Sequence, residues 1–213
     1  YSNHVSPIPA GLPLDVAAPI LCAGVTVYAA LKNSYTIVGD YVVVPGAGGG
    51  LGHLALQYAK AMGLRTIAID SGAEKEKLCK DLGATAWIDF KKESDIIAAV
   101  RRVTDGVGAH AAIVAAASGE SYEKALEYLR PRGTLVAVGL PADTKIKADV
   151  FFTVFDSKRI VGSYVGNRQD AVEALNLAAN AGIKPHFTVE PLSNLPSVYE
   201  RMKAGTVTGR IVL

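Results

Sequence analysis

The chain has 213 residues, of which 50% are hydrophobic and 20% charged, so a sizeable core is available and global disorder is excluded. A formal net charge of +2 gives no electrostatic case for binding nucleic acid or an anionic membrane. Two cysteines, Cys22 and Cys79, cannot make a disulfide framework and indicate a reducing compartment. No uninterrupted apolar run approaches the roughly 18 residues of a membrane span, so we expect no transmembrane helix and a cytoplasmic protein.

The amino-terminal part begins at Tyr1 without a methionine, and we therefore expect a piece of a longer protein. Residues 1–20 hold four of the ten prolines, which predicts an extended lead-in. Residues 41–44 are apolar and rich in β-branched side chains, as is typical of a strand buried on both faces. Helical spacing of apolar residues from Leu51 to Met62 then predicts a helix that ends at Gly63.

Strands and helices alternate over the next hundred residues. We expect strands at 66–69, 86–90, 111–115, 133–139 and 160–163, and helices at 74–82, 122–129 and, with Ser94 as its cap, 94–103. This alternation predicts an α/β fold with a doubly wound parallel sheet (a Rossmann fold), whose ligand binds at the carboxyl ends of the strands. After Tyr164 the pattern changes to a helix at 170–181, a strand at 187–189, a helix at 196–203 and a strand at 210–213.

A glycine loop follows the first strand. Its pattern is Gly46-x-x-Gly49-x-x-Gly52, because Ala47 stands where the strict G-x-G-x-x-G motif begins. Glycines let a pyrophosphate approach the backbone amides, and the following helix offers unpaired N–H groups and a partial positive charge. We expect no side chain to be tolerated at Gly49 or Gly50, because it would hold the phosphate away or strain φ. The alternative is a bare structural turn.

Asp70 ends the second strand, 18 residues after Gly52. A carboxylate at this place accepts hydrogen bonds from both hydroxyls of an adenosine ribose and repels a 2′-phosphate. Loop and carboxylate together predict dinucleotide binding, with NAD preferred over NADP. The alternative is that Asp70 only caps the turn at Ser71-Gly72.

Several segments carry a family resemblance. Residues 19–28, the glycine loop, and residues 57–63, 69–70 and 160–168 resemble the zinc-dependent, medium-chain alcohol dehydrogenases, most closely the fungal, yeast-like branch. The resemblance covers essentially the whole chain but only the second part of such an enzyme. It implies a remnant of the catalytic domain and a linker at 1–24, an NAD-binding Rossmann domain at 25–163, and a return segment to the catalytic domain at 164–213.

The resemblance also implies site residues. Cys22 matches the third protein ligand of the catalytic zinc. The implied cofactor-binding positions are Thr26 and Leu51 behind the nicotinamide, Gly49, Gly50 and Leu51 at the pyrophosphate, Asp70 and Lys75 at the adenosine ribose, Phe90 near the adenine, Val138, Leu140, Ser163 and Val165 at the nicotinamide wall, and Arg210 at the pyrophosphate.

Each of these positions has a plain structural alternative. Cys22 alone would be a small buried hydrophobe. Lys75 and Arg210 would be ordinary surface charges, and Phe90 and Leu140 would be core residues.

The remaining candidates carry no motif. The four histidines have no nucleophilic or acidic partner at motif spacing, and we expect surface positions, with contact between His53 and a phosphate as the alternative. Cys79 is given no role.

The implied activity is NAD-dependent oxidation of small alcohols or reduction of aldehydes, with zinc as Lewis acid. Catalytic zinc needs about three protein ligands, and this chain offers one cysteine, so we expect the chain alone to bind NAD but neither to retain zinc nor to oxidise alcohol. The resemblance further implies a dimer or tetramer joined near Ile160. Residues 150–152 fit either an interface or the core.

Two other functions remain open. A zinc-independent quinone reductase of the same superfamily would keep the sheet but favour NADPH. A stand-alone NAD-binding or interaction module would lack catalysis.

Overall fold

The computed structural model describes residues 5–116 and 118–213. A six-stranded parallel sheet forms its centre, in the order β3-β2-β1-β4-β5-β6. The strands are β1 (Tyr41–Pro45), β2 (Arg65–Asp70), β3 (Ala86–Asp89), β4 (Ala109–Val114), β5 (Leu129–Ala137) and β6 (Arg159–Gly162). This is the order of the doubly wound dinucleotide-binding folds, so the predicted fold class is confirmed. Because all six strands run in parallel, β1, β2 and β4 present their carboxyl ends at one edge.

The core lies on both faces of this sheet. Val42 and Val44 of β1 pack into one buried cluster, and Val43 between them packs into the other. Successive side chains of a strand point to opposite faces, so a strand covered on both sides is apolar throughout. The expectation for residues 41–44 is therefore confirmed.

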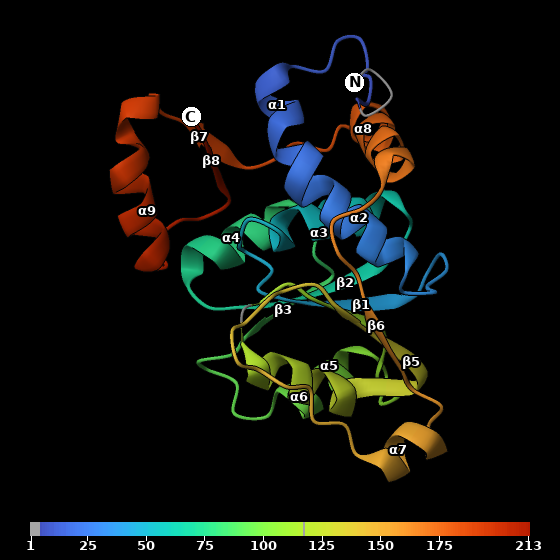
Figure 1. The fold of residues 1–213 in the computed structure, drawn as a ribbon. Coiled ribbons are helices and arrows are strands. Elements are labelled where there is room, and N and C mark those ends of the chain that lie inside the picture. The colour runs from blue at the N-terminus through green and yellow to red at the C-terminus, as the bar shows by residue number, and fades with distance from the viewer. Residues whose placement is uncertain (1–4, 117) are drawn as a thin grey trace.

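Helices cover the two faces in separate layers (Figure 1). One layer holds α2 (Val25–Lys32), α3 (Gly52–Ala61), α4 (Ala73–Asp81) and α8 (Arg168–Ala181). The other holds α5 (Ile96–Val103) and α6 (Gly119–Tyr128), which pack against each other. The cap of α5 is Asp95, whose carboxylate accepts from the amide of Ala98 at 2.9 Å, so the expectation for Ser94 is wrong by one residue.

The amino-terminal segment differs from the extended lead-in that we expected. Helix α1 (Leu14–Pro19), one π-helical turn η2 (Ile20–Gly24) and α2 form a continuous stretch. Pro13 lies just outside the first turn, and Pro19 lies where the helix widens into the π turn. Proline is tolerated just before the first turn of a helix, where its missing N–H leaves no bond unmade. Inside the helix, the widened π turn accommodates the loss of the hydrogen bond that Pro19 cannot donate.

This stretch, Leu14–Lys32, is long and apolar enough by length and composition alone to cross a membrane, a test that a buried core helix also passes. In the structure it behaves as a core helix. Ile20, Ala23, Val27 and Leu31 are fully or almost fully buried, and α2 packs against α3 and α8.

The carboxyl-terminal part leaves the six-stranded sheet and forms a separate unit, whose strand β8 contacts α1 (Figure 1). After α8 come β7 (Phe187–Val189), the short 3-10 turn η3 (Leu192–Asn194), α9 (Leu195–Lys203) and β8 (Arg210–Val212). Strands β7 and β8 pair in parallel as a separate two-stranded sheet. We call residues 183–213 the return strap, because β8 brings the chain back beside the glycine loop.

One helix was not expected from the sequence. Helix α7 (Val150–Phe155) projects away from the sheet at the end of the molecule opposite the return strap (Figure 1). Phe151 and Phe155 are stacked with ring centroids 5.7 Å apart, yet both are mostly exposed. The alternative that residues 150–152 belong to the core is therefore wrong.

Candidate functional site

The glycine loop fills the turn between β1 and α3. Gly46 has φ +78°, the left-handed region that favours glycine, and its amide donates to the carbonyl of Ile69 at 2.8 Å. A Cβ on Gly52 would lie 2.2 Å from the Gly46 carbonyl oxygen. Gly46 thus makes the turn, and Gly52 allows α3 to pack closely on the strand.

Gly49 and Gly50 do not have positive φ, so our expectation of strain at these positions is wrong. A Cβ on Gly49 would meet only the Gly46 carbonyl, at 3.3 Å. A Cβ on Gly50 would lie 2.7 Å from Arg210 Nε and 2.9 Å from the carbonyl oxygen of Gly209. Gly50 is therefore required by the close approach of the return strap.

The loop presents unpaired donors. Within the described part of the chain, the backbone amides of Gly50 and Leu51 have no hydrogen-bond acceptor. They lie at the amino-terminal end of α3, where the helix dipole adds partial positive charge. Such a pair of amides is suited to bind the oxygens of an anion.

Asp70 lies at the end of β2 and is buried. Its Oδ2 accepts from the Gly48 amide at 2.9 Å, and its Oδ1 accepts from the Ser71 amide at 2.9 Å and from Lys75 Nζ at 3.0 Å. The carboxylate therefore supports the glycine loop and the following turn. Since a carboxylate offers about four acceptor positions, one remains for a ligand.

A first pocket of about 450 Å³ opens beside this carboxylate. Gly46 and Gly49 line it on one side, and Asp70, Lys75 and Phe90 on another. Phe90 is half exposed, and Lys75 is paired with Asp70. The alternatives of a core phenylalanine and an isolated surface lysine are therefore wrong.

A second pocket of about 490 Å³ lies on the other side of the loop. It shares Gly46, Gly49 and Ala115 with the first pocket and adds Leu51 and Arg210. The glycine loop thus separates two adjoining hollows at the carboxyl edge of the sheet. This arrangement suits a ligand with two bulky halves and a negatively charged middle.

Arg210 joins the return strap to the loop. Its Nε donates to the Gly50 carbonyl at 3.1 Å, and burial lowers the pKa of its guanidinium. The side chain is only partly exposed, so the alternative of a plain surface charge is wrong. The other guanidinium N–H groups have no acceptor among the described residues, which leaves them available to an anion at the loop.

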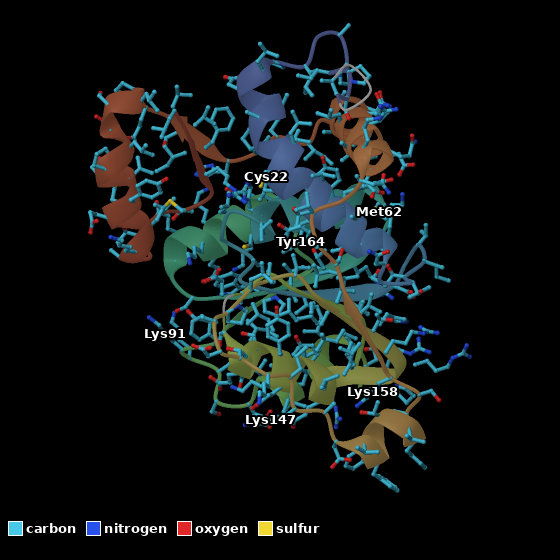
Figure 2. All side chains as sticks on the ribbon, viewed as in Figure 1. Cys22, Met62, Lys91, Lys147, Lys158 and Tyr164 are labelled. Carbon is cyan, nitrogen blue, oxygen red and sulfur yellow. The ribbon has the colours of Figure 1, made fainter. Side chains whose placement is uncertain are left out.

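Cys22 lies in the π turn and is exposed, so the alternative of a buried hydrophobe is wrong. Its carbonyl accepts from Thr26 Oγ1 at 2.6 Å. In Figure 2, Cys22 lies on the side of the sheet that carries α3, far from Lys147 and Lys158. In the described ranges no group of three His, Cys, Asp or Glu side chains gathers to hold a metal.

The predicted nicotinamide wall is spread over the ends of β5 and β6. Val138 and Ser163 are buried, whereas Leu140 is 80% exposed, which rules out the core alternative for Leu140. Ser163 Oγ accepts from Asn33 Nδ2 at 3.2 Å, and Val165 has φ +49°. None of these residues, nor Thr26, lines the two pockets at the loop.

The histidines correct our surface expectation in one important case. His53, in the first turn of α3, is completely buried, and both ring nitrogens bond to backbone groups, so it does not face a phosphate. His110 is half-buried and lies 3.1 Å from Asp40, and His186 is exposed. His4 lies outside the described residues. The only signal for His53 in the sequence was its place directly after the last glycine of the loop.

Comparisons with known proteins decide the family. Residues 50–180 match the family model described as zinc-binding dehydrogenase. The chain belongs to the zinc-binding dehydrogenase family. It is 53% identical over its whole length to alcohol dehydrogenase 1 of Emericella nidulans and 49% identical to an alcohol dehydrogenase of Schizosaccharomyces pombe, and it spans 61% and 60% of these relatives. The resemblance to fungal alcohol dehydrogenases is therefore confirmed.

Several solved structures share the fold. An alcohol dehydrogenase from Aeropyrum pernix superposes with a TM-score of 0.85 at 30% identity, over 93% of this chain and 57% of the other. A cinnamyl alcohol dehydrogenase from Sorghum bicolor gives a TM-score of 0.85 at 30% identity, over 97% of this chain and 57% of the other. A quinone oxidoreductase from Pseudomonas syringae, at 24% identity, shares the fold alone.

Proposed function

We propose that this chain binds NAD for a zinc-dependent dehydrogenase that interconverts small alcohols and aldehydes. The observation that carries the proposal is the pair of free amides at Gly50 and Leu51, set between two pockets, with the Asp70 carboxylate in the first. The named relatives support the reaction class. The chain spans about three fifths of their length, so the activity is proposed for the protein that contains it.

The residues fit a dinucleotide. The amides of Gly50 and Leu51 would bind the pyrophosphate, and the free N–H groups of Arg210 would add a positive charge there. Asp70 would accept from the adenosine ribose and Lys75 would donate to it, beside Phe90. When bound, NAD supplies the acceptor for the hydride, while the protein fixes its position.

A nicotinamide position at Thr26, Val138, Leu140, Ser163 and Val165 remains a prediction. Its support is the resemblance alone, because these side chains line neither pocket. A wall that is complete only beside further protein would leave Leu140 exposed as it is here.

Zinc fits these residues only in part. Catalytic zinc uses about three protein ligands, and the described residues supply Cys22 as a candidate but no set of three. The chain by itself therefore does not fit a zinc site, and we assign no chemical step to a metal. Further ligands would have to come from outside the described residues. The prediction that Cys22 contributes one ligand stands with that condition.

The cofactor is tested by titrating NAD and NADP against the wild type and two variants. Asp70→Asn keeps an acceptor for the Gly48 amide but removes the charge, whereas Asp70→Ala removes both. A carboxylate against a 2′-phosphate costs on the order of 2 kcal/mol, so we expect NAD to bind about 30-fold more tightly than NADP. Asp70→Asn should lose most of this preference. Equal affinity of the wild type for both cofactors would sink the assignment.

The reaction is tested in the protein that contains the chain, loaded with zinc. NAD-linked oxidation of short alcohols is expected. NADPH-linked quinone reduction without zinc would support the reductase alternative, and cofactor binding without turnover of either substrate would support the binding module. A cytoplasmic location and a homo-oligomer remain predictions.

A further inference from the structure

The imidazole of His53 bridges two segments that lie far apart in the sequence. Its Nδ1 lies 2.8 Å from the carbonyl oxygen of Gly49, and its Nε2 lies 3.0 Å from the amide nitrogen of His186 in the return strap. A backbone amide can only donate, so Nε2 is the acceptor and the ring proton resides on Nδ1. Both partners therefore select the same neutral tautomer.

These bonds belong to a closed ring of contacts. The carbonyl of His186 accepts from the Arg210 amide at 2.9 Å, and Arg210 Nε donates to the Gly50 carbonyl at 3.1 Å. The path thus runs from Gly49 through His53, His186 and Arg210 back to Gly50. The glycine loop and the return strap are held by one buried side chain at one end and by one arginine at the other.

The ring fixes the directions of the loop amides. In a planar trans peptide the C=O and the following N–H point in opposite directions. The Gly49 carbonyl accepts from the His53 backbone amide at 3.1 Å and from the His53 imidazole at 2.8 Å, so the imidazole adds a second bond that sets the direction of the Gly50 N–H. When Arg210 holds the Gly50 carbonyl, it sets the direction of the Leu51 N–H. Neither of these two amides has an acceptor among the described residues.

We propose that His53 is a positioning residue for the cofactor: it couples the return strap to the glycine loop, so that the free amides and Arg210 are oriented together before the dinucleotide binds. The inference rests on the proposed binding of NAD. It gives the return strap a part in building the phosphate site in addition to closing the fold.

Gln57 provides a matched control. It lies one helical turn after His53 and exchanges two hydrogen bonds with Lys184, through Nε2 to the carbonyl at 2.9 Å and from the amide to Oε1 at 3.0 Å. It thus ties the same helix to the same strap without touching the Gly49 carbonyl. A role in attachment alone would be shared by both residues, whereas a role in orienting the loop belongs to His53.

The first test measures the dissociation constant of NAD. His53→Asn places an amide near the Nδ1 position and keeps the bond to Gly49, whereas His53→Gln places one near Nε2 and keeps the bond to His186. Because each breaks the ring at one bond, we expect each to weaken NAD binding about tenfold, and His53→Ala to weaken it further. Gln57→Ala should stay within about twofold of wild type while lowering stability.

The second test needs no cofactor. Hydrogen–deuterium exchange of the apo protein should show faster exchange in residues 46–52 and 184–212 for His53→Asn and His53→Gln, but only around residue 184 for Gln57→Ala. If the wild type fails to bind NAD, the proposed function falls and this exchange pattern still decides the inference. Wild-type NAD affinity in folded His53 variants, or equal losses in Gln57→Ala, would overturn it. Should His53→Ala not fold, the Asn and Gln variants decide.

Discussion

Burial of His53 should make the stability of the protein fall as the solution is acidified from neutral pH. Burial lowers the pKa of this imidazole from 6.5 to about 4, and the positive charge of Arg210 and the His186 ring act in the same direction, against the opposing bond to the Gly49 carbonyl. The unfolded chain takes up a proton near its ordinary pKa, whereas the folded chain does not until about pH 4. The native state therefore keeps its full stability above pH 6.5 and loses it progressively towards pH 4.

Linkage converts this difference into an energy. One pKa unit corresponds to about 1.4 kcal/mol, so the single group costs roughly 2 kcal/mol between pH 7 and pH 5, and about 3 kcal/mol by pH 4. Carboxylates such as Glu173, whose pKa is lowered to about 2 by its bonds to Lys32 and Tyr28, lose their contribution only below their unfolded pKa of about 4.5. The interval from pH 7 to pH 5 therefore isolates histidine.

The assay is urea denaturation followed by circular dichroism at pH 7, 6 and 5, for the wild type and His53→Asn. The wild type should lose about 2 kcal/mol more than the variant over this interval. Contributions from His110, whose pKa is also lowered by burial, occur in both proteins and cancel in the difference. Parallel losses in the two proteins would show that His53 does not remain neutral in the fold, and the reasoning from its burial would be refuted.

Three further perturbations follow from the same geometry. Gly52→Ala should lower the free energy of unfolding by about 3 kcal/mol, because its Cβ would meet backbone atoms. Gly162→Ala is the control, because its Cβ would have nothing within 4 Å, and it should cost under about 1 kcal/mol. Similar losses for the two variants in urea denaturation would contradict this. Lys75→Met removes the cation that is paired with the Asp70 carboxylate, so the ratio of the NADP to the NAD dissociation constant should rise roughly threefold to tenfold. A fall of this ratio in cofactor titrations would refute the role of the pair. A thiol reagent at neutral pH should modify one cysteine natively and two after denaturation, because Cys22 is exposed while burial raises the pKa of Cys79 to about 12; a protected Cys22 would return it to the core.

Local pattern was sufficient for most of the sheet. Each predicted strand overlaps an observed one. The signals used, runs of β-branched residues and glycines such as Gly63 and Gly182 that end helices, can be recognised from neighbouring residues alone. The amino-terminal helix was missed because four prolines suggested an extended chain. Proline removes one hydrogen bond, and here a π turn after Pro19 accommodates that loss, which is a property of tertiary packing rather than of local sequence.

The glycine loop and Asp70 could be predicted for the same local reason, since they lie at strand ends with fixed spacing. The contacts that support them have no local signal: the contact of His53 was not predicted, and the approach of Arg210 to the loop was implied by the family resemblance alone. His53 meets His186 at a separation of 133 residues, and Arg210 meets the Gly50 carbonyl at a separation of 160. No motif spacing records such contacts. A single sequence gives the residues that face a ligand more readily than those that hold these residues from behind.

The separation between the loop and Arg210 has a consequence for synthesis on the ribosome. Chains emerge at roughly 5–20 residues per second, so after Gly50 appears about 10–30 seconds pass before Arg210 is made. The strands from β1 to β6 come out earlier and can associate during that time. During this time the nascent protein carries a glycine loop that neither His186 nor Arg210 yet contacts, so its free amides are not held in the orientation that we propose for cofactor binding. Cofactor capture should then be a late event in biogenesis, after the sheet has formed.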